Sequence, residues 1–166
     1  MSASRRGFLT GRLSAVCRHE QRPPWAIDAA AFEAHCTRCG DCVRACPTGI
    51  VVAGGGGFPK VDFARGECTF CGDCATACTP AVLRREARAT PWSLTVTIAD
   101  TCLAGHGVEC RVCGETCDTG AIRFRPQLGG VARPQLEAAR CTGCGACYAP
   151  CPVSAIALAN EVEMNA

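Results

Sequence analysis

The chain has few aromatic residues and no long apolar run, and both shortages limit what it can be. Aromatic side chains make up 5% of its 166 residues, beside eighteen glycines, so a large side-chain core is not expected. No stretch approaches the roughly 18 apolar residues of a membrane-spanning helix. The N-terminal arginines are not followed by the apolar stretch of a cleavable secretory signal. We therefore expect a soluble, cytoplasmic protein.

The motifs of common enzyme classes are also missing. The sequence contains no nucleophile–base arrangement and no phosphate-binding loop. The glycine run Gly54 to Gly57 is expected to form a turn, because it does not match a G-x-G-x-x-G motif that opens a helix. We therefore expect no enzymatic activity.

Cysteine, in contrast, is abundant: the chain has seventeen, and sixteen of them fall into four runs. The first, second and fourth runs have the spacing C-x2-C-x2-C-x3-C. The third run is a variant in which seven residues separate the first two cysteines. In chain order the runs are Cys36, Cys39, Cys42 and Cys46; Cys68, Cys71, Cys74 and Cys78; Cys102, Cys110, Cys113 and Cys117; and Cys141, Cys144, Cys147 and Cys151.

This spacing is typical of the thiolate ligands of [4Fe–4S] clusters in bacterial ferredoxins. Disulfides would need an oxidising compartment, and zinc sites favour two separated C-x2-C pairs. We therefore expect the sixteen cysteines to bind up to four [4Fe–4S] clusters. Each oxidised cluster with its four thiolates contributes a charge of about −2, so the net charge falls from +2 to about −6. Such a charge disfavours a nucleic-acid partner.

The runs form two pairs, each with the organisation of a two-cluster ferredoxin. The stretches between paired runs, 21 residues after Cys46 and 23 after Cys117, are predicted to be β-hairpins because short strand patterns flank glycines. In such repeats the fourth cysteine of each run binds the cluster of the other run. The predicted sites are I (Cys36, Cys39, Cys42, Cys78), II (Cys68, Cys71, Cys74, Cys46), III (Cys102, Cys110, Cys113, Cys151) and IV (Cys141, Cys144, Cys147, Cys117).

The predicted fold is α+β, with two tandem bacterial two-cluster ferredoxin-like modules behind a basic N-terminal tail. Residues 1–30 are assigned to the tail, 31–80 to the first module, 81–97 to a linker and 98–160 to the second module. Within and beside the linker, Pro80 to Arg88 is predicted to be a short helix, and Trp92 to Ile98 alternates as a strand.

Several residues admit two interpretations. Cys102 is either a ligand carried on a longer loop or a free thiol beside a labile or three-iron cluster. His106 is favoured as a solvated loop residue over a ligand, as are His19 and His35. Cys17, outside every run, is favoured as a spare thiol. Arg5 and Arg6 belong either to a docking element or to a plain basic tail.

Together with the four cysteine runs, several specific stretches carry a resemblance to a known family. These are ASRRGFLTGR, RPPWA, CLAGHGVECRVCGETC, AIRFRPQLGG and CTGCGACYAPCPVSAI. With them, the chain resembles the NapF family, the ferredoxin-type proteins of periplasmic nitrate reductase systems. The variant third run and the arginine pair make the resemblance specific.

The resemblance implies a function. Members of this family are thought to act in the cytoplasm on the precursor of the nitrate reductase catalytic subunit, assisting its maturation before export. By resemblance, the sixteen cysteines carry over as cluster ligands. The alternatives are an electron-transfer ferredoxin and an iron–sulfur subunit of an oxidoreductase complex.

Overall fold

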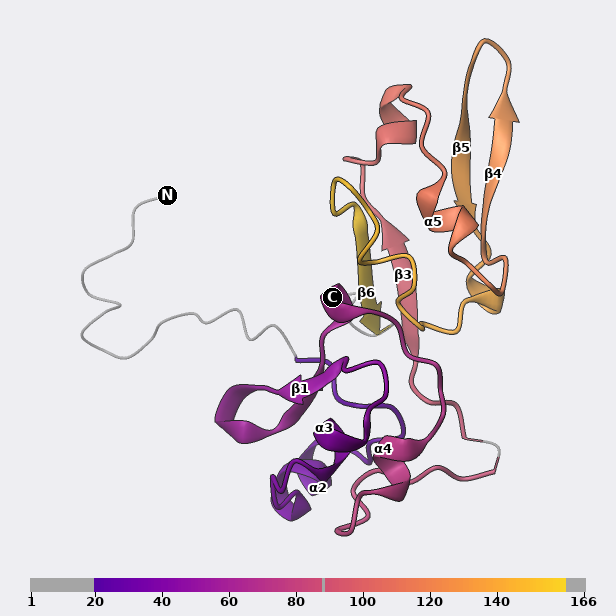
Figure 1. Ribbon diagram of the computed structural model, residues 1–166. Helices are drawn as coiled ribbons and strands as arrows, with labels where there is room; N and C mark the ends of the chain where they lie inside the picture. The colour runs from indigo at the N-terminus through magenta and orange to yellow at the C-terminus, as the bar shows by residue number, and fades with distance from the viewer. Residues whose placement is uncertain (1–19, 88, 161–166) are drawn as a thin grey trace, which may run out of the picture.

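The computed structural model describes residues 20–87 and 89–160, in which short helices and small sheets alternate (Figure 1). The helices are α2 (Ala29–His35), α3 (Asp41–Ala45), α4 (Asp73–Thr76) and α5 (Val112–Glu115), with 3-10 turns η1 (Gly55–Gly57), η2 (Phe63–Arg65), η3 (Leu103–His106) and η4 (Ala138–Arg140). The strands are β1 (Val51–Ala53), β2 (Pro59–Val61), β3 (Leu94–Ile98), β4 (Ile122–Gln127), β5 (Gly130–Leu136) and β6 (Ile156–Asn160).

Two of the three sheets in the described residues are the predicted hairpins. Strands β1 and β2 pair antiparallel with Val51 opposite Val61, and β4 and β5 pair with Ile122 opposite Leu136. In both hairpins, apolar residues that alternate with exposed ones along the strands point into the core, and glycines form the turn. The second hairpin is longer and extends away from the first half of the chain (Figure 1).

A second pairing closes each half of the molecule by joining the segment before its first run to the segment after its second run. In the second half this is the β3–β6 pair, which runs from Leu94 opposite Asn160 to Ile98 opposite Ile156. In the first half it is a single bridge between Ala26 and Leu83. The two halves therefore share one topology, with a much shorter closing pair in the first.

This closure corrects two predictions. Residues 80–87 form no helix, because Leu83 is held in the bridge to Ala26 with only 3% of its surface exposed. Residues 20–30 are not part of a separate tail: Trp25 is 7% exposed, and its backbone N–H donates to the carbonyl of Pro91 at 2.7 Å. Residues 1–19, including Arg5, Arg6, Cys17 and His19, lie outside the described residues.

Among the described residues the apolar core forms two small clusters, one mainly in each half, with Leu94 of β3 joining the first cluster and Leu158 of β6 packing against both. The first gathers around Phe32, Ile50 and Phe63, and the second around Val96, Ile122 and Ile156. Cysteines belong to both clusters: each contains two of the buried third cysteines of the runs, Cys42 and Cys74 in the first, Cys113 and Cys147 in the second. The core is thus built around the cysteines.

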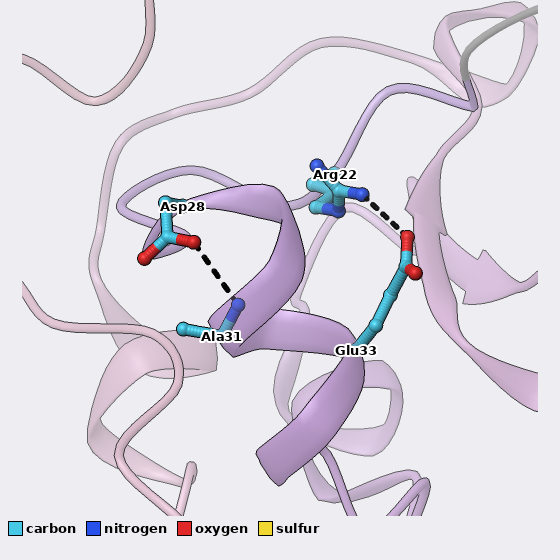
Figure 2. A network of polar contacts seen from close by, with 4 residues as sticks. All are labelled: Arg22, Asp28, Ala31 and Glu33. Atoms are coloured by element: carbon cyan, nitrogen blue, oxygen red, sulfur yellow. Dashed lines mark hydrogen bonds and ion pairs between the residues drawn. The ribbon is translucent and has the colours of Figure 1, made fainter.

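Helix α2 leads directly into the first run, and its start is fixed by a side-chain cap. The carboxylate of Asp28 accepts a hydrogen bond from the N–H of Ala31 at 3.0 Å (Figure 2). This satisfies one of the N–H groups that have no partner in the first helical turn. Arg22 and Glu33 form a neighbouring ion pair at 3.0 Å, in which the Glu33 side chain is 63% exposed.

We predict that Asp28→Ala lowers the thermal unfolding midpoint of the iron-loaded protein by about 2–4 °C, because an N-cap contributes about 1 kcal/mol. Glu33→Gln is the matched control, and its effect should be smaller because exposed ion pairs contribute little. Anaerobic circular dichroism during heating measures both. An equal decrease in the two variants would contradict the capping argument.

Candidate metal centres

Four cavities in the described part of the chain are each lined by four cysteines. Each leaves about 300–350 Å³ of space, part of it open to solvent, between side chains that are otherwise mainly apolar. The cysteines that line them are Cys36, Cys39, Cys42 and Cys78 at site I; Cys46, Cys68, Cys71 and Cys74 at site II; Cys102, Cys110, Cys113 and Cys151 at site III; and Cys117, Cys141, Cys144 and Cys147 at site IV.

Each cavity therefore combines three cysteines of one run with the fourth cysteine of the paired run. Cys46 leaves its own run to line site II, and Cys78 lines site I in return. Cys117 and Cys151 make the same exchange in the second half. This is the grouping expected for crossed ligation in a two-cluster ferredoxin.

Left-handed backbone turns shape three of the runs. The residue before the second cysteine has a positive φ in each: 58° at Arg38, 54° at Phe70 and 69° at Gly143. A glycine with positive φ then follows the second cysteine and, in the first two runs, caps the short helix that carries the third cysteine. Positive φ is costly for arginine and phenylalanine, and such strain is common where backbone surrounds a bound group.

The third run reaches the same arrangement by a different path. Its first cysteine, Cys102, precedes the 3-10 turn η3, which ends at Gly107 with φ of 79°. This turn takes up the longer insertion and leaves Cys102 on the wall of site III beside Cys110. His106 is exposed and does not line the cavity, and His35 is likewise exposed. The geometry agrees with the long-loop interpretation of Cys102.

The third cysteine of every run is buried, with 6–9% of its surface exposed. Burial, with a smaller contribution from neighbouring thiolates, raises the pKa to about 11 for Cys42 and Cys113 and to about 12 for Cys74 and Cys147. A free thiol there stays protonated at neutral pH. Four thiolates can share such a cavity only if a cationic group compensates them.

The fourth cysteines Cys46 and Cys117 differ from the third. Burial acts to raise the pKa of Cys46, but hydrogen bonds from the Thr48 hydroxyl and nearby backbone N–H groups outweigh it, and the pKa is lowered. Cys117 has the same environment with Thr119. The sulfur-to-hydroxyl distance is 3.5 Å in both. The sequence places a threonine two residues after each of these fourth cysteines, but the cysteine spacing alone does not indicate its role.

The donor set fits a cluster better than a single ion. Among the described residues, no three His, Cys, Asp or Glu side chains lie close enough together to hold one metal ion. In a cubane cluster each thiolate binds a different iron, so the four sulfurs lie farther apart than around one ion. Soft sulfur donors around an apolar cavity suit iron–sulfur chemistry.

Comparison with known proteins agrees with this geometry. The family model of the 4Fe-4S dicluster domain matches residues 35–82 and 108–155. The ferredoxin-type protein NapF of Escherichia coli K12 is 50% identical over 157 residues, 94% of each chain. NapF of Haemophilus influenzae is 46% identical, covering 97% of this chain and 96% of its own. The chain belongs to the NapF family of ferredoxin-type proteins.

A more distant relative is the ferredoxin-type protein NapG of Haemophilus influenzae, 33% identical over 82% of this chain and 57% of its own. No solved structure matches the chain. Within the NapF family the two dicluster domains accommodate up to four [4Fe–4S] clusters, as the sequence predicted. In residues 20–87 and 89–160, no helix is both long enough and apolar enough to cross a membrane.

We predict that removing iron with a chelator under anaerobic conditions abolishes most of the β-strand signal in circular dichroism. The apolar core is divided and contains the cysteines themselves, so the bound clusters hold it together. Iron and sulfide added back should restore the signal. A strand signal that survives complete removal of iron would show that the fold does not depend on the clusters.

Proposed function

We propose that this NapF-family protein acts in the cytoplasm on the precursor of the catalytic subunit of periplasmic nitrate reductase and assists its maturation before export. The match to NapF proteins over about 95% of the chain carries the proposal. Under this proposal the protein is an accessory factor without catalysis of its own. Its partner would be the precursor, and neither nucleic acid nor membrane would be required.

We further propose that the sixteen cysteines lining sites I to IV are the cluster ligands. A bound [4Fe–4S] cluster supplies one-electron transfer. The residues of this chain would hold it and keep water away, as Ile50 and Val51 do on the wall of site II with at most 2% exposure. The division into modules 31–80 and 98–160, joined by residues 81–97, stays our proposal. The basic segment 1–30 would then contribute its described part to the first module.

Crossed ligation can be tested by counting iron in paired substitutions. We predict that Cys46→Ser removes about one quarter of the iron, because one cluster of four loses a ligand. Adding Cys74→Ser, at the same site II, should cost no more iron. Adding Cys42→Ser instead, at site I, should lower the iron to about one half.

The reverse pattern would show that each run binds its own cluster. Cys78→Ser provides the complementary experiment at site I, with Cys36→Ser as its same-site partner. Cys17→Ser is the control for a cysteine outside every run, and it should leave the iron content unchanged.

One observation favours the rival function of a general electron carrier. Cys39 of site I and Cys71 of site II are exposed, so clusters bound there would approach the surface, where electrons can pass to a partner. A maturation factor and a shuttle differ in their partners: the former binds one precursor, and the latter meets several oxidoreductases briefly.

We predict that the tagged protein, purified anaerobically from the cytoplasm of nitrate-respiring cells, recovers the uncleaved precursor of the nitrate reductase catalytic subunit. The mature subunit should be absent, since it has left the cytoplasm. Mass spectrometry of the signal-peptide region distinguishes the two forms. Recovery of a dehydrogenase or quinol-linked complex without the precursor would favour the electron-carrier function instead.

A further inference from the structure

Sites II and IV, which belong to different halves of the molecule, are joined directly through their cysteines. The backbone N–H of Cys68 donates a hydrogen bond to the carbonyl of Cys144 at 2.8 Å. Cys68 lines site II and Cys144 lines site IV. A single hydrogen bond therefore connects the ligand backbone of one site with that of the other.

A glycine on each side of Cys144 lets this part of the backbone pack closely against its neighbours. Gly143 and Gly145 flank Cys144, and both have positive φ, 69° and 83°. A Cβ atom on Gly145 would lie 2.1 Å from the ring of Phe63, and one on Gly143 would lie 2.7 Å from the carbonyl oxygen of Leu94. A side chain at Gly145 would push the two halves apart at site IV, whereas a side chain at Gly143 would clash with β3 of its own half.

Aromatic rings fill the rest of this contact. Trp92 packs edge-on against Phe63 and Phe70, with ring centroids 5.7 and 5.8 Å away. Its indole N–H donates to the carbonyl of Thr142 at 3.1 Å, and Tyr148 lies 6.4 Å from the Phe63 ring. Phe70 lies between Cys68 and Cys71 and lines site II, so the ring cluster packs directly against that site.

The crossed pairing fixes the order of the sites. Sites I and II exchange cysteines in the first half, and sites III and IV exchange cysteines in the second. With site II joined to site IV, the order along the molecule is I, II, IV, III. Sites II and IV are the inner pair and sites I and III the outer pair.

The inner pair also has side-chain hydroxyl donors at a position where the outer pair has none, although the sulfur of Cys151 at site III accepts a hydrogen bond from the backbone N–H of Ala155 at 3.2 Å. The residue two places after the fourth cysteine is Thr48 for site II and Thr119 for site IV, each 3.5 Å from the sulfur. At sites I and III the same position is Pro80 and Val153, which have no hydroxyl group. A hydroxyl bonded to a ligand sulfur stabilises the more negative, reduced state of a cluster.

We propose that the contact between Cys68 and Cys144 is the electron-transfer junction between the two halves, and that Thr48 and Thr119 make sites II and IV the pair in which electrons collect. One electron leaves a reduced cluster at site II, which returns to its 2+ state, and enters an oxidised cluster at site IV, which becomes 1+. No bond breaks and no proton moves. The inference needs only iron-loaded sites, not a particular client, so its failure leaves the maturation role standing.

An anaerobic redox titration with dithionite, followed by electron paramagnetic resonance, tests the role of the threonines. Thr48→Val should shift one of the two highest reduction potentials to a more negative value, and Thr119→Val should shift the other. Thr79→Val is the matched control, because Thr79 is exposed and follows Cys78 directly; it should shift none. Unchanged potentials, or shifts confined to the lower pair, would overturn the proposal.

The same titration tests the junction. When half of the clusters are reduced, the spectrum should show magnetic interaction between paramagnetic clusters at sites II and IV. Gly145→Ala, with its iron content verified, should weaken this interaction by separating the halves. If that variant loses iron, Trp92→Phe should weaken the magnetic interaction to a smaller extent, because it keeps an aromatic ring but removes the donor to the carbonyl of Thr142. An uncoupled wild-type spectrum, or coupling unchanged in the iron-loaded variants, would overturn the junction.

Discussion

The gathering of four thiol groups into a small apolar cavity is the constraint on which the rest of this structure depends. Burial, with a smaller contribution from the neighbouring thiolates, raises the pKa of Cys74 and Cys147 to about 12, so four neighbouring thiolates are not stable there by themselves. A cationic cluster reverses this balance and turns a repulsive arrangement into the main cohesive one. Since the chain contributes few large buried side chains, its helices and hairpins are arranged around these cavities.

The local features of the fold were predictable because they follow from short-range patterns. The spacing of the cysteines and the glycines between alternating segments predicted both hairpins and the strand ending at Ile98. The grouping of Cys46 with the second run also followed, from a general rule for two-cluster ferredoxins. The NapF relatives confirm the cofactor class that these patterns predicted.

Long-range contacts account for what the sequence did not predict. Residues 80–87 have a helical composition, yet Leu83 pairs with Ala26, more than fifty residues earlier in the chain. The same contact draws Trp25 into the core, although the two prolines before it and the nearby arginines suggested that this segment was a tail. No local pattern encodes such a pairing, because its stabilisation comes from apolar area buried between distant segments.

The closing pairs of the two halves differ in a way that bears on their dynamics. Five consecutive residue pairs between β3 and β6 close the second half. The first half is closed by one bridge and by the few backbone hydrogen bonds around Trp25 and Leu83. Local opening costs less free energy where fewer backbone hydrogen bonds must break together. Because of this difference, we expect the closing pair of the half that holds sites I and II to open locally more readily than the β3–β6 pair, which closes the half that holds sites III and IV.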